Sequence, residues 1–462
     1  MQKTVLQEIL FKKIIWLNKK KKQFPLHTFK NQIKLTKKNF HTALTSIHPS
    51  FILECKKHSP SLGLINKHFN IEKITRIYKK YASVISILTD EDYFHGKFEY
   101  LSQCRSITHQ PILCKDFFID EYQIYLARYY QADAILLMLS VLNDYQYKKL
   151  SNIAQTMHMG ILTEVHNLTE LNRAIALKAK VIGINNRNLH DLTININQTK
   201  ILAIKIPKNT IIISESGISN YNQIRELSPL VDGFLIGSSL MQSTNLDESI
   251  RCLIMGKNKI CGLTRIEDAK VVSNSGAIYG GLIFCKKSIR NIDEKHAYSM
   301  IKEVPMKYIG VFCNESIFFI NKIINNLNLY GIQLHGKENQ DYINNLFKII
   351  PKSTQIWKAI SIDNNVPLLN WNNVNNYILD NKNGGGTGKT FNWSVLNNHN
   401  LTNVFLAGGL NINNCFNAST IGCIGLDFNS GVEISPGIKD KEKIKIIFKI
   451  LRHFHLFKYK LY

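Results

Sequence analysis

The sequence predicts an α/β protein made of two consecutive (β/α)₈ TIM barrels, the first preceded by a helical extension. Three observations support this prediction. The chain has 462 residues, more than one hydrophobic core usually supports. Short apolar, β-rich runs recur along it, separated by segments of helical length. Eight such runs fall in each half, and eight strands with their crossovers are the number that closes a barrel.

The two sets of runs divide the chain into halves of barrel length. In the first half the runs begin at Phe51, Ser83, Pro111, Ala134, Gly160, Val181, Thr210 and Gly233. In the second half they begin at Lys259, Tyr279, Tyr308, Gly331, Thr354, Tyr377, Asn403 and Cys423. Two doubly wound open sheets are the alternative, but neither half opens with the strand, Gly-x-Gly-x-x-Gly and helix of that fold. Barrels are therefore favoured.

The boundary between the halves falls near Gly256. We expect a first domain over residues 1–256 and a second over residues 257–462. Residues before Phe51 precede the first strand and are expected to form helices packed across or beside the first barrel. The segment after about Lys439 is predicted to be the last helix, followed by a short tail.

The net charge of +24 would suit a nucleic acid or an anionic membrane. The lysines, however, are spread along the chain with abundant asparagine and isoleucine, whereas a nucleic-acid-binding face requires clustering. The one run, residues 19–22, has no aromatic residues interleaved and is interpreted as a solvated helix end. We therefore expect no nucleic acid partner.

Cysteine usage and hydropathy bear on the compartment. The chain has nine cysteines, an odd number, and no Cys-x-x-Cys pair, which argues against a disulfide framework or a zinc site. No stretch has the length of a membrane span or the apolar core of a signal peptide. We expect a cytoplasmic protein with no membrane partner. Two barrels in one chain remove the simplest need for a dimer, so a monomer is expected.

Polar residues end many apolar runs of the first half. In a barrel, the loops at the carboxyl ends of the strands build the active site. The residues concerned are Glu54, Lys56, Lys115, Glu164, Asn185, Arg187, Glu215 and Ser216. A buried salt bridge could explain any one of them, but not so many strand ends at once. The dipeptides Ser216-Gly217 and Gly237-Ser238 end runs seven and eight, where barrels commonly hold phosphate.

The first half closely resembles the indole-3-glycerol-phosphate synthase family over nearly its whole length. The resemblance lies in the segments ILECKKHSPSLG, LTDEDYFHG, PILCKDFFID, GINNRNL, ISESGI and GFLIGSSLM. It implies closure of the pyrrole ring of carboxyphenylamino-deoxyribulose phosphate with loss of CO₂ and water. The family uses no metal or organic cofactor.

The resemblance also implies residue roles in the first barrel. Lys115 would be a general acid on the carbonyl oxygen, Glu164 its partner acid or base in dehydration, and Lys56 a cation near the reacting centre. The division of acid work between the two lysines stays open. The orienting groups would be Glu54, Asn185 and Glu215. The anthranilate carboxylate would lie near Arg187 and Ser59. The phosphate cradle would comprise Ser216, Gly217, Gly237 and Ser238.

The second half carries less charge at the ends of its runs. Cys261 lies in the opening run, Arg290 follows the second run, and His335 and Asp380 end the fourth and sixth. A lone cysteine in a strand is usually a small buried hydrophobe. A thiol and a carboxylate facing each other across a barrel mouth, however, suit paired proton transfer, one as base and one as acid. We interpret His335 as structural.

Two glycine-rich segments accompany these residues: GGGTGKT at residues 384–390 and AGGL at residues 407–410. The first suggests a nucleotide-binding P-loop. A P-loop, however, needs glycine where this chain has Asn383. A glycine nest that receives a small phosphate is the favoured interpretation.

The second half resembles the phosphoribosylanthranilate isomerase family. The resemblance lies in KICGLTR, GGLIF, IGVF, QLHG, LDN, GGTGKTFNW, AGGL, LDFNSGVE and PGIKD. It implies an Amadori rearrangement of N-(5-phosphoribosyl)anthranilate, with Cys261 as general base, Asp380 as general acid on the ring oxygen and Arg290 on the anthranilate carboxylate. Phosphate would lie on Gly386, Gly409, Ser430 and Gly431. The loop at residues 285–289 lacks the prolines common in the family, which puts its rigidity in doubt.

The two resemblances together imply consecutive steps of tryptophan biosynthesis. The isomerase product is the synthase substrate, and the order of the halves in the chain is the reverse of the pathway. The expected partners are therefore small phosphorylated anthranilate derivatives.

Overall fold

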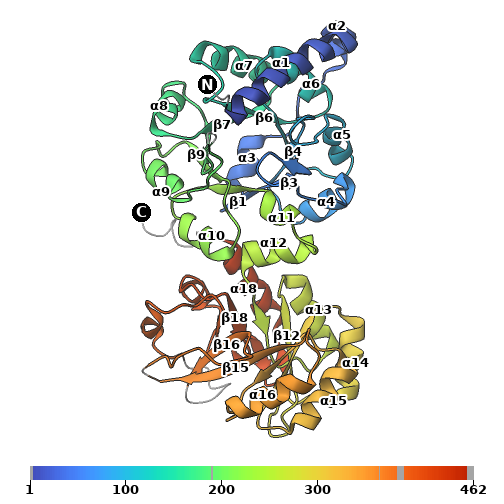
Figure 1. Cartoon of the computed structure of the whole chain (residues 1–462), viewed down its shortest axis with the longest axis vertical. Coiled ribbons are helices and arrows are strands. Elements are labelled where there is room, and N and C mark those ends of the chain that lie inside the picture. Colours follow the sequence, from blue (N-terminus) through green and yellow to red (C-terminus); the bar gives the residue numbers. More distant parts are fainter. Residues whose placement is uncertain (1–3, 189–190, 364, 382–389, 455–462) are drawn as a thin grey trace. The chain divides into compact units, whose positions relative to one another are not determined.

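A computed structural model of the chain describes residues 4–188, 191–363, 365–381 and 390–454 (Figure 1). The chain divides into two compact units. Unit 1 comprises residues 1–219 and 226–250, and unit 2 comprises residues 220–225 and 251–462.

Unit 1 contains a closed barrel of eight parallel strands. The strands are β1 (Ser50–Cys55), β4 (Val84–Leu88), β5 (Ile112–Lys115), β6 (Ala134–Met138), β7 (Gly160–Val165), β8 (Val181–Asn185), β9 (Ile211–Glu215) and β10 (Gly233–Ile236). Strand β1 pairs in parallel with both β4 and β10, which closes the sheet. Closure leaves no unpaired edge and excludes the open-sheet alternative.

Helices follow the strands of the first barrel. They are α4 (Ile71–Tyr78), α5 (Glu99–Arg105), α6 (Glu121–Tyr129), α7 (Asp144–Thr156), α8 (Leu168–Ala176), α9 (Asn197–Ala203), α10 (Tyr221–Leu227), α11 (Ser238–Met241) and α12 (Leu246–Met255). Local sequence explains where they start: Asn143 caps α7 in a reciprocal capping box with Gln146. A short hairpin of β2 (His58–Ser59) and β3 (Gly63–Leu64) follows β1.

The predicted helical extension is confirmed. It comprises α1 (Val5–Gln23), α2 (Leu26–Phe29), the 3₁₀ helix Lys30–Gln32 and α3 (Phe40–Thr45). Phe40 and Leu44 of α3 belong to the buried cluster inside the first barrel.

Helix α1 packs through one face. Its buried residues Ile9, Lys13 and Leu17 are spaced four apart, so they lie on the same side of the helix. Lys13 is a charged residue in this apolar stripe. Its Nζ atom lies 2.7 Å from both Asp90 and Asp116, which follow β4 and β5. A buried lysine therefore ties α1 to the end of the barrel where those strands finish.

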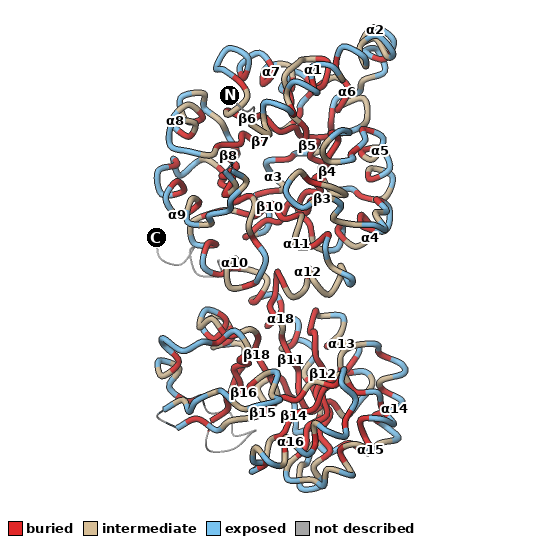
Figure 2. The backbone as a smooth tube through the Cα atoms, in the orientation of Figure 1, coloured by how far each residue is buried: buried red, intermediate tan, exposed pale blue. Residues whose placement is uncertain are grey.

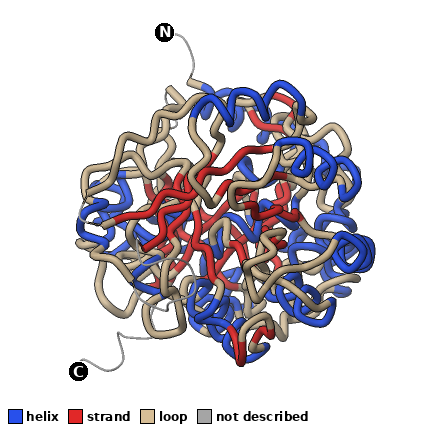
Figure 3. Tube along the Cα trace, turned by 90° about the horizontal axis from the view of Figure 1, so that it is seen from below, coloured by secondary structure: helices blue, strands red, loops and turns tan. Residues whose placement is uncertain are grey.

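Unit 2 contains a second closed parallel barrel. Its strands are β11 (Lys259–Ile260), β12 (Tyr279–Ile283), β13 (Lys307–Phe312), β14 (Gly331–Leu334), β15 (Gln355–Ile362), β16 (Asn376–Asn381), β17 (Val404–Leu406) and β18 (Gly425–Phe428). Strand β11 pairs with both β12 and β18. In Figure 3, which shows both units, strands gather toward the centre and helices lie around them. In Figure 2, buried residues are seen along the labelled strands β11, β12 and β14.

The helices of unit 2 are shorter on one side of the barrel. They are α13 (Ile266–Ser275), α14 (Glu294–Glu303), α15 (Ile317–Leu327), α16 (Gln340–Ile349), the 3₁₀ helix Trp393–Leu396, α17 (Cys415–Ala418), the 3₁₀ helix Ser430–Val432 and α18 (Lys441–Arg452). A small antiparallel hairpin, β19 (Glu433–Ser435) and β20 (Ile438–Lys439), precedes α18. Trp357 and Phe405 stack inside this barrel, with ring centroids 4.5 Å apart.

Two further findings concern the chain as described. None of its helices combines the length and the apolar character that crossing a bilayer requires. All nine cysteines are free thiols.

Candidate active sites

Lys115 is the centre of the polar cluster in the first barrel. It ends β5, and its Nζ atom lies 3.0 Å from Oε2 of Glu215 and 3.3 Å from Oε2 of Glu164. Burial alone would lower the pKa of Lys115, but Glu215, Glu164 and Glu54 together raise it above its ordinary value. The side chain is therefore held as an ammonium inside the barrel mouth.

The two carboxylates beside Lys115 have different environments. Burial raises the pKa of Glu215 to about 7, against the opposing effect of Lys115. Burial would also raise the pKa of Glu164, but Lys115 and His166 outweigh it and hold that pKa below the ordinary range. One carboxylate is thus ionised while its neighbour can take up a proton near neutral pH, a difference that suits acid and base roles.

Glu164 has a second cationic neighbour that the sequence analysis missed. Nε2 of His166 lies 3.2 Å from Oε1 of Glu164, and Nδ1 lies 3.1 Å from Oε2 of Glu170. Burial would lower the pKa of His166, but these two carboxylates raise it to about 9. The available signal was a titratable residue two positions beyond the carboxylate at the same strand end.

Lys56 forms a close ion pair with Glu54. Its Nζ atom lies 2.6 Å from Oε2 of Glu54, whose side chain is buried at the end of β1. Glu54 occupies the space over Gly237, where an added Cβ atom would lie 2.4 Å from that same oxygen. Glycine is therefore required at residue 237 if Glu54 is to keep this position.

A cavity of about 720 Å³ collects most of the predicted residues. The predicted residues that line it are Glu54, Lys56, Lys115, Arg187, Glu215, Ser216, Gly217, Gly237 and Ser238. Asn185 lines an adjoining hollow together with Arg187, and its side chain accepts a hydrogen bond of 3.0 Å from the Arg187 backbone N–H. Glu164 reaches the cavity through its ion pair with Lys115.

Ser59 is placed differently from the other predicted binding residues. It is buried, and its hydroxyl accepts a hydrogen bond of 3.2 Å from the backbone N–H of Leu62. Its neighbours Pro60, Ser61 and Leu62 line the cavity instead. The Ser59 hydroxyl therefore stabilises the turn formed by residues 59–62. Its contact with substrate stays a prediction.

The turn after β9 has the backbone expected of a close approach to a ligand. Ser216 and Gly217 both have positive φ, of 65° and 84°. Positive φ is uncommon for serine, and such strain concentrates at functional sites. A Cβ atom on Gly217 would lie 2.5 Å from Cγ2 of Ile194, so the loop above closes over a bare backbone.

The second barrel has a smaller pocket, of about 220 Å³. Its lining includes Cys261, Arg290, His335, Asp380, Gly409, Ser430 and Gly431. Cys261 and Asp380 therefore face one pocket, as the sequence predicted for an acid and base pair. Gly386 lies outside the described residues.

Cys261 lies above a buried cation that the sequence analysis did not single out. Burial raises the pKa of the Cys261 thiol, and Lys259 partly offsets this rise. Lys259 has no exposed side-chain surface and pairs with Asp427 at 2.7 Å and Gln333 at 2.9 Å. It precedes Cys261 by two residues, so the alternation of a strand could have placed both on the same face.

The environment of Asp380 raises the pKa of its carboxyl group above the ordinary value. Burial raises its pKa, although the backbone N–H of Asn381, at 2.7 Å, acts in the opposite direction. His335 Nε2 lies 3.9 Å from Oδ2 of Asp380, and His335 lines the pocket. The Nδ1 atom of His335 is hydrogen-bonded to the side-chain amide of Gln333 at 2.8 Å, and the interpretation of His335 as structural stays a prediction.

Two asparagine side chains hydrogen-bond to the glycine turn that follows β17. Gly408 and Gly409 have positive φ, of 82° and 65°. The side-chain amides of Asn411 and Asn414 each donate a hydrogen bond of 3.0 Å to the Gly409 carbonyl. Gly431 packs so closely that a Cβ atom there would lie 2.0 Å from the Leu410 carbonyl oxygen. A small anion could approach this backbone directly.

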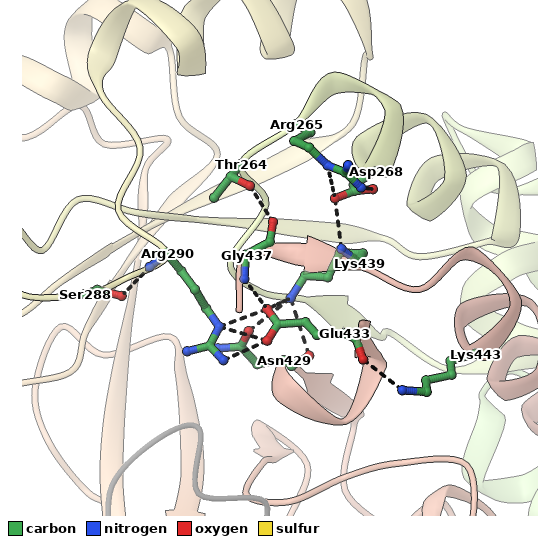
Figure 4. A network of polar contacts seen from close by, with 10 residues as sticks. All are labelled: Thr264, Arg265, Asp268, Ser288, Arg290, Asn429, Glu433, Gly437, Lys439 and Lys443. Atoms are coloured by element: carbon green, nitrogen blue, oxygen red, sulfur yellow. Dashed lines mark hydrogen bonds and ion pairs between the residues drawn. The ribbon is translucent and has the colours of Figure 1, made fainter. Parts of the chain in front are cut away.

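Arg290, the predicted carboxylate contact, is paired in the structure with Glu433 (Figure 4). The two side chains are joined by bonds of 2.9 Å (Nε to Oε1) and 2.7 Å (Nη2 to Oε2). No group of three or more His, Cys, Asp and Glu side chains in the described ranges could hold a metal ion.

Paired acids, bases and cations thus line a cavity in each barrel, and in the first they stand at the carboxyl ends of the strands. These features define a two-site enzyme built on (β/α)₈ barrels. Family models agree: residues 6–253 match the model described as "Indole-3-glycerol phosphate synthase", and residues 258–450 match "N-(5'phosphoribosyl)anthranilate (PRA) isomerase". The chain belongs to the first family over one domain and to the second over the other. It is a bifunctional enzyme of tryptophan biosynthesis.

Whole-length relatives have the same arrangement. The chain is 58% identical to "Tryptophan biosynthesis protein TrpCF" of Buchnera aphidicola subsp. Schizaphis graminum, over 98% of this chain and 100% of that protein. It is 51% identical to the protein of the same name from Yersinia pestis, over 97% and 94% of the two chains. A phosphoribosyl anthranilate isomerase structure from Thermotoga maritima is 33% identical, with a TM-score of 0.39, and covers 43% of this chain and 99% of that one.

Proposed function

We propose that the second domain isomerises N-(5-phosphoribosyl)anthranilate to 1-(2-carboxyphenylamino)-1-deoxyribulose 5-phosphate. The first domain then closes the indole ring of that product to give indole-3-glycerol phosphate, CO₂ and water. We place the two domains at residues 257–462 and 1–256, a division that the family matches support because they end at residue 253 and begin again at residue 258. The observation that carries the proposal is the pairing of proton donors with acceptors in each cavity.

Isomerisation requires one proton to leave C2 and one to reach the ring oxygen. Asp380, whose pKa burial raises, donates to the ring oxygen as the furanose opens. Cys261 removes the proton from C2 as its thiolate, which the nearby Lys259 ammonium stabilises. Arg290 holds the anthranilate carboxylate, and the backbone around Gly386, Gly409, Ser430 and Gly431 holds the phosphate.

Ring closure requires a cation at the substrate carbonyl. Lys115 donates a proton to the carbonyl oxygen while the ring carbon attacks, and the carboxylate leaves as CO₂. Glu164 acts as the acid or base when the hydroxyl group leaves as water. Lys56 stabilises negative charge at the reacting centre.

The remaining residues of the first cavity bind and orient the substrate. Glu54, Asn185 and Glu215 orient the lysines and the ring. Arg187 and the Ser59 loop bind the anthranilate carboxylate. The phosphate lies on Ser216, Gly217, Gly237 and Ser238. The positive φ at Ser216 and Gly217 supports this last assignment, because strained backbone of this kind concentrates at ligand-binding turns.

We further propose that the protein works as a cytoplasmic monomer. Nine free thiols fit a reducing compartment. Light scattering on the purified chain tests the monomer, since a mass of twice 53.0 kDa would contradict it.

A coupled fluorescence assay on the purified protein, with a metal chelator present, tests the function. It follows the consumption of phosphoribosylanthranilate and then the appearance of indole-3-glycerol phosphate. We expect both steps to proceed with the chelator. Loss of either step on chelation would contradict the metal-free mechanism for that barrel.

A further inference from the structure

The loop that carries Arg290 lacks the prolines that would stiffen it, yet the Arg290 side chain is held firmly. Glu433 forms a two-point ion pair with one edge of the guanidinium, through Nε and Nη2 (Figure 4). The exposed fractions of the two side chains are 11% for Arg290 and 4% for Glu433. A buried bidentate pair of this kind fixes both the position and the plane of a guanidinium.

Glu433 is itself held by a second cation. Lys439, whose side chain has no exposed surface, lies with Nζ 2.8 Å from Oε1 of Glu433. The same ammonium donates to Oδ1 of Asn429 at 3.0 Å, and the backbone N–H of Gly437 donates to Oε1 of Glu433 at 3.2 Å. Glu433 cannot swing away from Arg290 without breaking these contacts.

Glu433 faces two basic side chains, Arg290 and Lys439. Burial would raise the pKa of Glu433, but Arg290 and Lys439 lower it below its ordinary value, so the carboxylate stays ionised. Burial lowers the pKa of Lys439, against the opposing effect of Glu433. Nearby Arg265 and Asp268 form their own pair at 2.7 Å. The guanidinium of Arg290 keeps its charge at neutral pH and remains able to bind an anion.

Arg290 still has hydrogen-bonding capacity that faces the pocket. A guanidinium carries five N–H groups in two forks, and Glu433 takes the fork formed by Nε and Nη2. Among the described residues, Nη1 of Arg290 has no hydrogen-bond partner, and Arg290 lines the pocket beside Cys261. The stem of Arg290 lies against Gly262, where a Cβ atom would come within 2.9 Å of its Cδ. The second fork is left for a carboxylate ligand.

Glu433 also stands next to the predicted phosphate cradle. It follows the 3₁₀ helix Ser430–Val432 directly in the chain and begins β19. Its backbone carbonyl accepts a hydrogen bond of 2.8 Å from Lys443 at the start of α18. The residue that orients Arg290 is thus rigidly attached to the segment that would hold the opposite, phosphorylated end of the substrate.

We propose that Glu433 is a positioning residue for isomerisation: it holds Arg290 so that its free fork receives the substrate carboxylate at a fixed distance from the phosphate cradle. This inference rests on the proposed role of Arg290. It predicts a defect in substrate binding rather than in proton transfer, because Glu433 does not touch Cys261 or Asp380 in any contact of the described chain.

The test uses Glu433→Gln in the full-length protein and measures KM and kcat for isomerisation separately. We expect KM to rise about tenfold or more, the effect of losing a charge-assisted hydrogen bond, with kcat within a factor of about three. Glu303→Gln is the matched control, because Glu303 forms an ion pair with Lys270 on the surface of the same barrel. Ring closure by the first domain measures the concentration of intact protein, and circular dichroism with thermal unfolding shows whether the second domain is folded.

A second variant covers the case in which Glu433→Gln fails to fold. Glu433→Asp keeps the charge that neutralises Lys439 but is one methylene too short for Arg290, so KM should again rise. An unchanged KM in a folded Glu433→Asp or Glu433→Gln variant would overturn the inference.

A double-mutant cycle separates this inference from the proposed function. If Glu433 acts through Arg290, adding Glu433→Gln to Arg290→Ala should raise KM no further. Additive effects would overturn the positioning role. An unchanged KM in Arg290→Ala alone would instead refute the assignment of Arg290 to the substrate carboxylate, and with it the proposal made here.

Discussion

The Nζ atom of Lys115 lies 3.0 Å from Oε2 of Glu215, and both side chains are carried into the mouth of the first barrel by the last residues of β5 and β9. Burial would neutralise an isolated lysine at this position. The adjacent carboxylates prevent that and keep a proton on the nitrogen at neutral pH. The Lys115 ammonium is thus a proton donor at a position with little exposure to solvent.

Lys115→Met should remove this donor while preserving the volume of the side chain. We expect ring closure to fall by about 10²- to 10⁴-fold, the usual contribution of a general acid. Isomerisation in the second domain should be unchanged, which controls for folding and concentration. Both rates are measured on one preparation by product fluorescence. Near-normal ring closure would contradict the assignment of Lys115.

His166 should give the first domain a distinct pH dependence of stability. Its pKa rises from 6.5 to about 9 on folding, so its ion pairs with Glu164 and Glu170 stabilise the folded state fully below pH 6.5. That contribution, roughly 3 kcal/mol at most, is lost as pH rises through 9. His166→Asn should therefore lower the urea midpoint for loss of ring closure at pH 6 but hardly at pH 9.5.

The exposed His296 of α14 provides the control for that experiment, because its side chain is 74% exposed and it lies in the other unit. His296→Asn should leave the midpoint for ring closure unchanged at both pH values. An equal loss of stability in His166→Asn at pH 6 and pH 9.5 would show that packing, not charge, explains the effect.

Cys261→Ser should separate the two activities in the opposite sense. Serine has nearly the same shape but a hydroxyl that is far harder to ionise, so it cannot take the proton from C2. Isomerisation should fall by at least about 10²-fold, while ring closure of supplied carboxyphenylamino-deoxyribulose phosphate proceeds normally. Retention of isomerisation would refute the base assignment.

Lys13→Met should destabilise the first domain although Lys13 belongs to the N-terminal extension. Removing one partner from a buried ion pair typically costs about 3–5 kcal/mol, because the remaining charge is left uncompensated. Asp90 and Asp116 would both be left in this state. Thermal inactivation of ring closure measures the effect. The triple variant with Asp90→Asn and Asp116→Asn should regain part of the loss, and a further loss there would contradict the electrostatic explanation.

The strands and their ends were predictable from the sequence because each signal is local. Each of the sixteen predicted runs begins within two residues of the first residue of an observed strand. The residues that end those runs converge because parallel strands in a barrel end at one rim. The sequence alone therefore places Lys115, Glu164 and Glu215 together.

The partners of those residues were not predictable, because pairing depends on distance in space. Arg290 and Glu433 are 143 residues apart in the chain, and no local pattern connects them. Lys13 gave only a weak signal, a charge in the apolar stripe of a helix. For Ser59, whose place in a motif predicts a contact with substrate, the structure adds a hydrogen bond within its own loop that the motif did not indicate.

The ion pairs of Lys13 also order events during synthesis of the chain. Helix α1 leaves the ribosome before both carboxylates that receive its lysine, because these belong to segments beyond β4 and β5. Until then the apolar stripe of α1 has no complete surface to cover, and its lysine must stay hydrated. Helix α1 thus cannot complete its ion pairs until residue 116 has been made, so this part of the nascent first barrel is exposed to chaperones or to misfolding for longer than the position of α1 in the chain suggests.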